Sequence, residues 1–548
     1  MVDLRPDQLA TVRAILQAEV PECEVWAFGS RAKWTARDSS DLDLALVASE
    51  RLPLSKIGRL RESFKDSYLP VKVDVVDIHR VSDEFRKIIE SQKVVLQKPS
   101  AAAAQTDRAK WQTLPLEECL ETIIDYRGKT PTKVSNGIPL ITAKVVKNGR
   151  IETPDEFIAE EDYEGWMRRG IPRAGDVLLT MEAPLGEVAQ LDDRKVALAQ
   201  RLVALRGKQG LLDNWYLKYL LQSDLVQDQL KSRATGTTVL GIKQSELRKI
   251  NLALPPFDEQ RAMAQVLGTL DDKIELNRRM NETLEAMARA LFQSWFVNFD
   301  PVRAKLDSRL PEVDAATAGL FPDDFEDSTL GPIPQGWTST NLGKEADFFT
   351  GFAFKSKMFS ENPPGVRLAR GDNVKEGSFY WDSKTRYWPE ITSDIERYQL
   401  KTGDVLIGMD GSKVGKNWVR VRRCDLPCLL VQRVARLRAR SSIGAHFIWL
   451  LVSDPRFQFH VEAVKTGTSI PHISGGQIKA YGFIRPPTGD DRIFHRFEQL
   501  VAPMCDQMDV NIEQSRTLTA LRDALLPKLL SGELRVPAAT KPVETKHA

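Results

Sequence analysis

Apolar residues recur at helical spacing in two long stretches of the chain, and each stretch follows a pair of prolines. Residues 257–296 come after Pro255 and Pro256, and residues 494–529 come after Pro486 and Pro487. Charged residues fill the positions between the apolar ones, which is the pattern of an amphipathic helix. At about 1.5 Å per residue, roughly 40 helical residues span about 60 Å, too long for a helix inside one globular domain. We therefore predict two long helices whose apolar stripes are Met263, Val266, Leu267, Leu270, Ile274, Met280, Leu284, Met287, Leu291 and Trp295 in the first, and Phe494, Phe497, Leu500, Val501, Met504, Met508, Ile512, Leu518, Leu521, Leu525 and Leu529 in the second.

Sequence matches extend upstream from both predicted helices, which indicates a large internal repeat. Each copy opens at a tryptophan, Trp111 or Trp337, and we read each as a mixed α/β body followed by one long helix. We expect the two helices to pair within the chain as an antiparallel coiled coil; pairing between two chains is the alternative. The matching segments are 175–179 (GlyAspValLeuLeu) with 403–407 (GlyAspValLeuIle), 199–206 with 431–438, 235–238 (ThrGlyThrThr) with 466–469 (ThrGlyThrSer), and ProPro at 255–256 with 486–487.

Local patterns inside the first copy predict short elements separated by turns. Residues 138–142, 176–181 and 196–205 read as strands, and residues 215–221 have helical spacing. The first copy contains no histidine and no phosphate-binding loop of the Walker type. Binding is therefore the more economical role for this part of the chain than nucleophilic catalysis.

The N-terminal region contains a different kind of pattern, with three aspartates on predicted strands. Asp41 and Asp43 stand at the entrance of the apolar run 42–47, and Asp74 lies in the β-rich run 71–78. Residues 41 and 43 point to the same side of a strand, where two carboxylates are costly to hold together without a cation. Three carboxylates on adjacent strands could hold two Mg²⁺ ions that clamp a nucleoside triphosphate.

The ordered combination of GlySerArgAla at 29–32, SerAspLeuAspLeu at 40–44 and then Asp74 resembles the polymerase-β superfamily of nucleotidyltransferases, specifically its minimal stand-alone members. The resemblance covers residues 1–97. It implies nucleotide binding by Gly29, Ser30 and Arg31, metal binding and catalysis by Asp41, Asp43 and Asp74, and NTP and Mg²⁺ as cofactors of an active domain. One departure is that Lys33 and Trp34 follow the motif, where the family commonly has a small residue. The alternative is an inert domain in which these carboxylates are strand-end surface charges.

Composition limits the remaining possibilities. Lys and Arg number 77 and Asp and Glu 75, a formal charge of +2, so any nucleic-acid surface must be local. Five scattered cysteines favour a reducing compartment, and Cys424 and Cys428, the only close pair, suit buried thiols better than zinc ligands. We find no apolar run of membrane-spanning length and no signal peptide, so we expect a cytoplasmic location and no membrane partner.

The repeat resembles, over residues 111–536, the specificity subunit of type I restriction-modification systems. The features that carry this likeness are GlyProIleProGlnGlyTrp at 331–337, GlyAspValLeu in each copy, the two GlyThr loops, ProProPheAspGluGln at 255–260 and a long helix closing each copy. The second copy departs from the pattern, with ProProThrGlyAspAspArg at 486–492. The likeness implies two target-recognition domains that each read half of a bipartite double-stranded DNA target, with methyltransferase subunits, expected to be two, and restriction subunits as partners. The specificity part would need no cofactor.

The predicted organisation is α+β and multidomain. Lysine, arginine and hydroxyl residues around the GlyThr loops are the candidate DNA contacts, and solvated turns are the alternative reading. Two rival functions stay open: a nucleotidyltransferase that modifies a protein or RNA and is targeted by the repeat, and a non-catalytic antitoxin-like scaffold. The predicted units are a nucleotidyltransferase-like domain (1–97), a linker (98–110), a first target-recognition domain (111–253), a first long helix (254–300), a connection (301–330), a second target-recognition domain (331–485), a second long helix (486–536) and a disordered tail (537–548). The candidate DNA-binding residues are Lys231, Arg233, Thr235, Gly236, Thr237, Thr238, Lys243, Lys465, Thr466, Gly467, Thr468, Ser469 and His472.

Overall fold

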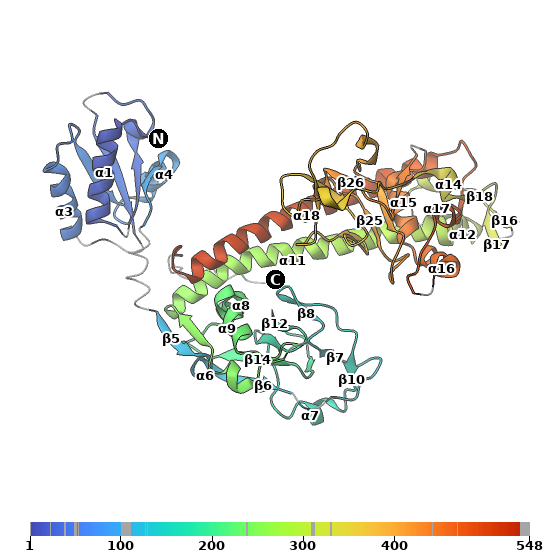
Figure 1. Ribbon diagram of the computed structural model, residues 1–548, viewed down its shortest axis with the longest axis horizontal. Helices are drawn as coiled ribbons and strands as arrows, with labels where there is room; N and C mark the ends of the chain where they lie inside the picture. Colours follow the sequence, from blue (N-terminus) through green and yellow to red (C-terminus); the bar gives the residue numbers. More distant parts are fainter. Residues whose placement is uncertain are drawn as a thin grey trace. The chain divides into compact units, whose positions relative to one another are not determined.

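The computed structural model of the chain separates into two compact units (Figure 1). One unit contains Met1–Asp271 and Thr519–Ala548, and the other contains Asp272–Leu518. The predicted linker, from residue 100 onward, and the predicted disordered tail lie outside the described residues. The residues that the structure describes are 2–21, 23–37, 40–48, 52, 54–99, 111–126, 128, 130–236, 239–307, 313–328, 331–440, 442–467 and 469–536.

The N-terminal region folds as a four-stranded sheet with helices on both faces. The strand order is β3-β2-β1-β4, with β1 antiparallel to β2 and β2 parallel to β3. Leu16, Leu44 and Leu60 belong to the core on one face, whereas Trp26 and Ile89 belong to a smaller core on the other. The elements are α1 (Pro6–Glu19), β1 (Glu24–Phe28), α2 (Gly29–Ala32), β2 (Leu42–Val47), α3 (Leu54–Lys65), β3 (Val73–Asp77), α4 (Asp83–Gln92) and β4 (Val94–Gln97).

The first body contains a four-stranded antiparallel sheet and a second, three-stranded sheet. The strand orders are β12-β11-β14-β6 and β10-β7-β13, and in the smaller sheet β7 is parallel to β13 and antiparallel to β10. Buried residues of α8 and the larger sheet form one core, and a second core lies between the sheets. The elements are β5 (Gln112–Pro115), β6 (Leu120–Asp125), β7 (Ile138–Ile141), β10 (Phe157–Ile158), β11 (Val177–Met181), β12 (Leu185–Gln190), β13 (Ala197–Leu198), β14 (Leu202–Gly207), α8 (Asn214–Gln222), α9 (Asp224–Ser232), α10 (Gln244–Leu247) and β15 (Asn251–Leu254).

The second body repeats this topology strand for strand, as the sequence matches predict. Its larger sheet has the order β25-β24-β27-β19 and its smaller sheet β23-β20-β26, again with one parallel and one antiparallel pair. A two-stranded pair closes each body, β15 with β5 in the first and β28 with β18 in the second. The elements are β18 (Thr338–Asn341), β19 (Ala346–Thr350), β20 (Val366–Ala369), β23 (Tyr387–Trp388), β24 (Val405–Gly408), β25 (Trp418–Arg420), β26 (Cys428–Leu430), β27 (Val434–Ala439), α15 (Ala445–Ser453), α16 (Pro455–Val464), α17 (Gly475–Lys479) and β28 (Gly482–Arg485).

One strand prediction was wrong in an informative way. Residues 196–205 form two strands, β13 and β14, which belong to different sheets. The break falls at Arg201, whose backbone is left-handed with φ of 76°. A residue in that conformation cannot continue a strand, so the chain turns there from one sheet to the other.

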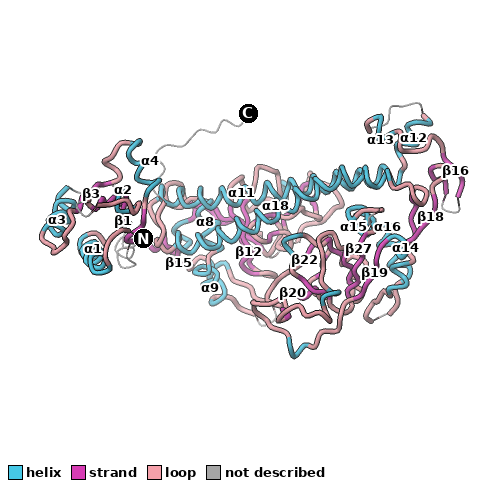
Figure 2. Tube along the Cα trace, turned by 90° about the horizontal axis from the view of Figure 1, so that it is seen from above, coloured by secondary structure: helices cyan, strands magenta, loops and turns pink. Residues whose placement is uncertain are grey.

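The two predicted long helices are present as α11 (Phe257–Gln293) and α18 (Arg492–Leu530), of 37 and 39 residues. They lie side by side (Figure 2), and the order of the contacts between them shows that they are antiparallel. Asn277 donates to Gln514 at 2.9 Å, and Asn281 accepts from Asn511 at 2.9 Å. The formation of a regular coiled coil stays a prediction. Not every predicted member of the apolar stripes is buried, because Met287 on α11 and Leu521 on α18 are about half exposed, at 50% and 47%.

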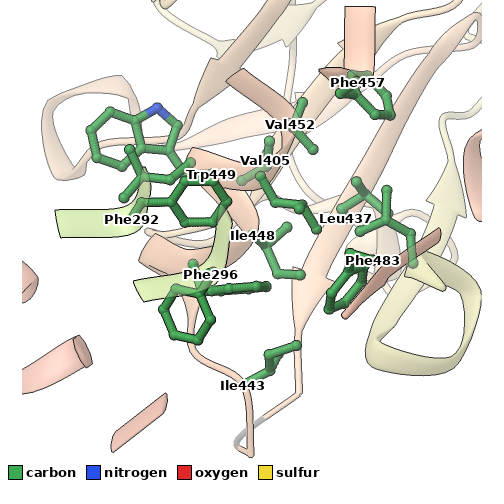
Figure 3. Close-up of a cluster of buried hydrophobic side chains, with 14 of the residues drawn as sticks. Phe292, Phe296, Val405, Leu437, Ile443, Ile448, Trp449, Val452, Phe457 and Phe483 are labelled. Atoms are coloured by element: carbon green, nitrogen blue, oxygen red, sulfur yellow. The ribbon is translucent and has the colours of Figure 1, made fainter. Parts of the chain in front are cut away.

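Aromatic side chains at the end of α11 enter the core of the second body (Figure 3). Phe292 lies on the last turn of α11, and Phe296 lies on the π-helical turn η1 (Ser294–Asn298) that follows. The ring of Phe296 lies 4.8 Å from that of Phe447 on α15 and 5.5 Å from that of Phe494 on α18. The predicted connection between the copies contains α12 (Asp300–Leu306), α13 (Ala315–Ala318) and β16 (Phe325–Ser328).

The helices α8 and α15 are equivalent, but their N-termini are capped differently. In α8 the side chain of Asp213, the residue just before the helix, accepts from the Tyr216 N–H at 3.0 Å. In α15 the residue just before the helix is glycine, and Glu498 of α18 accepts instead from the N–H groups of His446 and Phe447, at 3.0 and 3.1 Å. A carboxylate therefore satisfies free donors of both helices, from a local residue in one and a distant residue in the other.

Candidate functional site

The three predicted catalytic aspartates lie on, or one residue before, two neighbouring strands of the N-terminal sheet. Asp43 on β2 is in register with Asp74 on the parallel strand β3, and Asp41 stands one residue before β2. Gly29 follows β1 directly and has φ of 75°, and a Cβ placed there would lie 2.4 Å from Oδ2 of Asp43. Glycine is favoured at this position, because the left-handed backbone strains any other residue and a Cβ would have to displace the Asp43 carboxylate.

A lysine that the sequence analysis did not select lies between two of these carboxylates. Nζ of Lys72 is 3.4 Å from Oδ2 of Asp41 and 3.1 Å from the carboxylate of Asp74. Hydrogen bonding to Asp74 and attraction to both acids raise the pKa of Lys72. The pKa of Asp43 is raised by burial and by repulsion from Asp74 and Asp41. The site therefore concentrates negative charge that a cation relieves.

The donor set suits Mg²⁺ in its chemistry, because carboxylate oxygens are the ligands that this hard cation prefers. Among the residues that the structure describes, no three acidic, histidine or cysteine side chains already converge on one metal position. Magnesium binding would therefore require Asp41, Asp43 and Asp74 to turn toward a common point as the ion replaces the Lys72 ammonium. The assignment of these residues to metal ions stays a prediction.

The other two members of the GlySerArg motif have different environments. Ser30 lies on the short helix α2 and its carbonyl accepts from the N–H of Thr35 at 3.0 Å. Arg31 is buried, and its guanidinium donates to the carbonyls of Ser40 and Asp3, both at 2.9 Å. These bonds connect Ser40, the residue before Asp41, to the N-terminal segment, so Arg31 helps to position the strand that carries the acids. The predicted contact of Arg31 with a nucleotide stays a prediction.

The GlyThr loop of the first body forms a tight hairpin. Thr235 exchanges backbone hydrogen bonds with Gly241, and Gly236 has φ of 113°. Lys231 and Lys243 are exposed on either side of the hairpin, whereas Arg233 lies 3.4 Å from Glu246. The loop thus presents two exposed ammonium groups beside a backbone turn. The predicted contacts Thr237 and Thr238 lie outside the described residues.

The GlyThr loop of the second body has the same hydrogen-bonded form. Thr466 exchanges backbone hydrogen bonds with His472, and Gly467 has φ of 86°. Ser469 is exposed at the tip, and Lys465 forms an ion pair with Glu462. The predicted contact Thr468 lies outside the described residues. The structure therefore brings the described candidates of each copy together on one loop.

Each GlyThr hairpin also contacts an acidic residue that the sequence analysis missed. Glu182 forms a β-bridge with Gly241 in the first body, and Asp410 forms one with His472 in the second. The carboxylate of Asp410 also accepts a hydrogen bond from the His472 ring. The available signal was the matching MetGlu and MetAsp pairs that follow the GlyAspValLeu strands, at 181–182 and 409–410.

Comparison with known proteins assigns the two parts of the chain. Residues 109–286 match the model of the type I restriction modification DNA specificity domain, and residues 12–101 match that of polymerase beta nucleotidyltransferases. The type I restriction enzyme MjaIX specificity subunit of Methanocaldococcus jannaschii is 29% identical over 420 residues, covering 75% of this chain and 90% of that protein. The chain joins a nucleotidyltransferase domain to a type I restriction-modification specificity subunit. Both resemblances seen in the sequence are confirmed.

Further relatives match one part of this fusion or the other. The MjaVIII specificity subunit of the same archaeon is 26% identical over 437 residues, covering 78% of this chain and 93% of that protein. The probable protein adenylyltransferase MntA of Haemophilus influenzae is 46% identical over 96 residues, covering 18% of this chain and 84% of that protein. In the described part of the chain, no helix of the nucleotidyltransferase domain or the specificity subunit is both long and apolar enough to cross a bilayer.

Proposed function

We propose that residues 111–536 recognise a bipartite DNA target, with one half-site for each body, and dock two methyltransferase subunits together with restriction subunits. The observation that carries this proposal is the strand-for-strand duplication of the two bodies. Two copies of one binding fold suit two separated half-sites, as dimeric DNA-binding proteins do with two subunits. Lysine and arginine would supply affinity through phosphates, and a few side chains at base edges would supply discrimination.

The GlyThr hairpins are the proposed DNA contacts. In each body two backbone hydrogen bonds close the base of the loop, between Thr235 and Gly241 in the first and between Thr466 and His472 in the second, so the hydroxyl and basic residues around it lie close together. The proposed contacts are Lys231, Arg233, Thr235, Gly236, Thr237, Thr238 and Lys243 in the first body, and Lys465, Thr466, Gly467, Thr468, Ser469 and His472 in the second.

The test is single-molecule mapping of DNA methylation in cells that express the full chain with its methyltransferase subunit. The wild-type chain is expected to direct methylation to one bipartite motif. Lys231→Ala with Lys243→Ala should reduce methylation by weakening recognition of the first half-site only. Lys465→Ala with His472→Ala should do so by weakening recognition of the second half-site only. Absence of any modified motif with the wild-type chain would refute the proposed specificity function.

A second function belongs to the N-terminal domain, which we propose transfers a nucleotide from an NTP to a hydroxyl group of a protein or RNA. The strand register that places Asp43 beside Asp74, and the similarity to a probable protein adenylyltransferase, favour it. The acceptor oxygen would form a bond to the α-phosphorus of the nucleotide, and diphosphate would leave. Mg²⁺ bound by Asp41, Asp43 and Asp74 would neutralise the phosphates. Gly29 and Ser30 would allow the triphosphate to approach the backbone.

This activity can be separated from a scaffold role by removing the carboxylates. Asp41→Asn with Asp43→Asn in the full chain should abolish transfer of label from α-labelled ATP to proteins or RNA of the host. The matched control is Asp83→Asn with Glu84→Gln, which removes two exposed acids from α4. If the wild-type chain transfers no label, and the Asp41 and Asp43 variant keeps every partner interaction of the wild type, the domain is a non-catalytic scaffold.

A further inference from the structure

Arg201 and Arg433 occupy equivalent places in the two bodies and share an unusual backbone conformation. Each stands directly before the strand that follows the turn between the two sheets, β14 in the first body and β27 in the second. Their φ angles are 76° and 66°, in the left-handed region that an L-residue with a side chain rarely adopts. Glycine would adopt this conformation without steric cost. The chain therefore has an arginine at a place in each body where the backbone favours glycine.

Backbone hydrogen bonds connect each arginine to the GlyThr hairpin of its own body. The carbonyl of Arg201 accepts from the N–H of Met181 at 2.7 Å, and the carbonyl of Met181 accepts from Ile242, at the end of the hairpin, at 3.0 Å. In the second body the carbonyl of Arg433 accepts from Met409 at 3.0 Å, and that of Met409 accepts from Ile473 at 2.9 Å. Each arginine is thus one strand away from the proposed DNA-contacting loop.

Both arginines are exposed, and the guanidinium of Arg433 also forms an ion pair. Arg201 is exposed, and it forms no ion pair with any residue that the structure describes. The side chain of Arg433 is 73% exposed, and its Nη1 lies 3.2 Å from Oδ2 of Asp410, the carboxylate that also binds the His472 ring. An exposed guanidinium on a residue whose carbonyl is hydrogen-bonded to a neighbouring strand is well placed to donate two parallel hydrogen bonds to a phosphate.

We propose that Arg201 and Arg433 are matched contacts to the DNA phosphate backbone, one in each body; this inference rests on the proposed recognition of DNA. A non-glycine residue kept in a strained conformation indicates that its side chain has a function. The loops beside the two arginines differ, since the loop between β24 and β25 in the second body has Lys413 and Lys416, whereas the corresponding loop between β11 and β12 in the first body is residues 182–184 and has Glu182. An identical arginine within different loops suits a phosphate contact, because base contacts must change with the half-site and phosphate contacts need not.

The test replaces each arginine with glycine in the full chain and measures DNA binding as a function of salt. Arg201→Gly and Arg433→Gly remove the guanidinium and relieve the strained conformation, so both variants should melt at or above the wild-type temperature. Fluorescence anisotropy with a duplex carrying the methylated motif, from 50 to 200 mM salt, should show the slope of log affinity against log salt reduced by about 0.9 for each variant and by about 1.8 for both together. The reduction should be the same on a scrambled duplex.

Two further variant pairs separate the local contact from overall charge. Arg173→Ala and Lys401→Ala remove exposed charges at equivalent places before β11 and β24, at the ends of these strands that lie away from Arg201 and Arg433. Their salt slopes should fall by less than half as much as those of the glycine variants. Arg201→Lys and Arg433→Lys keep the charge and should keep the wild-type slope. Wild-type slopes in both glycine variants would overturn the inference, as would a loss of affinity confined to one base position of the target. A wild-type chain that binds motif and scrambled duplexes equally would instead overturn the proposed function.

Discussion

Removal of the Asp271 carboxylate should destabilise the first unit. This carboxylate lies on α11 and accepts hydrogen bonds from Nζ of Lys218 at 3.0 Å, the hydroxyl of Tyr219 at 2.8 Å and Nη1 of Arg522 at 2.9 Å. It therefore connects α8 of the first body with both long helices. Burial alone would raise the pKa of Asp271, but attraction to Lys218 and hydrogen bonds from Arg522, Tyr219 and Lys218 lower it.

The expected cost of Asp271→Ala follows from the burial of its partner. Only 7% of the Lys218 side chain is exposed, so the variant would leave an ammonium group buried without a counter-charge. Removing one member of a buried ion pair costs about 3–5 kcal/mol, because the remaining charge stays desolvated. The double variant Asp271→Ala with Lys218→Met removes both charges and should recover most of that loss.

The assay is urea unfolding of the full chain followed by far-ultraviolet circular dichroism, with the transition of the first unit compared between variants. Asp272→Ala is the matched control, because Asp272 is the next residue of the same helix and is exposed. Its effect should stay within about 0.5 kcal/mol. Equal midpoints for the Asp271 and Asp272 variants, or no recovery in the double variant, would refute this account of the cluster.

Two further predictions concern the second unit. Burial alone would lower the pKa of His446, but hydrogen bonds with Cys505 and Glu498 raise it from 6.5 to about 9. Protonated His446 should therefore stabilise the second unit by about 3 kcal/mol below pH 6.5, and this contribution should be lost as the pH rises through 9. In urea unfolding, a difference in stability between wild type and His446→Gln that does not change with pH would contradict this prediction. Phe296→Ala should cost about 3–5 kcal/mol in the same measurement, because the ring is buried among other aromatic rings, whereas Phe459→Ala, at a position 73% exposed, should cost less than about 0.5 kcal/mol.

The repeat and the long helices could be predicted from the sequence because both leave regular spacing in it. Matching segments such as 175–179 and 403–407 became equivalent strands, and the apolar period that starts after Pro255 became one uninterrupted helix. The break at Arg201 could not be predicted, since an arginine inside an apolar run gives no sign of a left-handed backbone. Periodicity describes which face a residue takes, but it does not specify the sheet to which it belongs.

The candidate sites were predicted in part for a similar reason. Asp43 and Asp74 lie on adjacent strands. The sequence could predict this, because the resemblance to a known domain supplies the strand pairing. The role of Lys72 depends on that pairing, and its sequence neighbours do not reveal that its ammonium meets Asp41. The contact between Asp410 and His472 joins residues 62 positions apart through two loops, whose conformations no local pattern encodes.

The cap that Glu498 places on α15 determines how the second body could be exchanged for another. The first body includes the cap of α8, since Asp213 precedes that helix directly. A foreign second body inserted between the strands β18 and β28 would leave Glu498 behind on the recipient helix, 54 residues after Gly444 in this chain. Such a graft would succeed where the long helix of the recipient has an acid that faces the start of the inserted α15. Its compatibility would thus depend on a residue outside the exchanged segment.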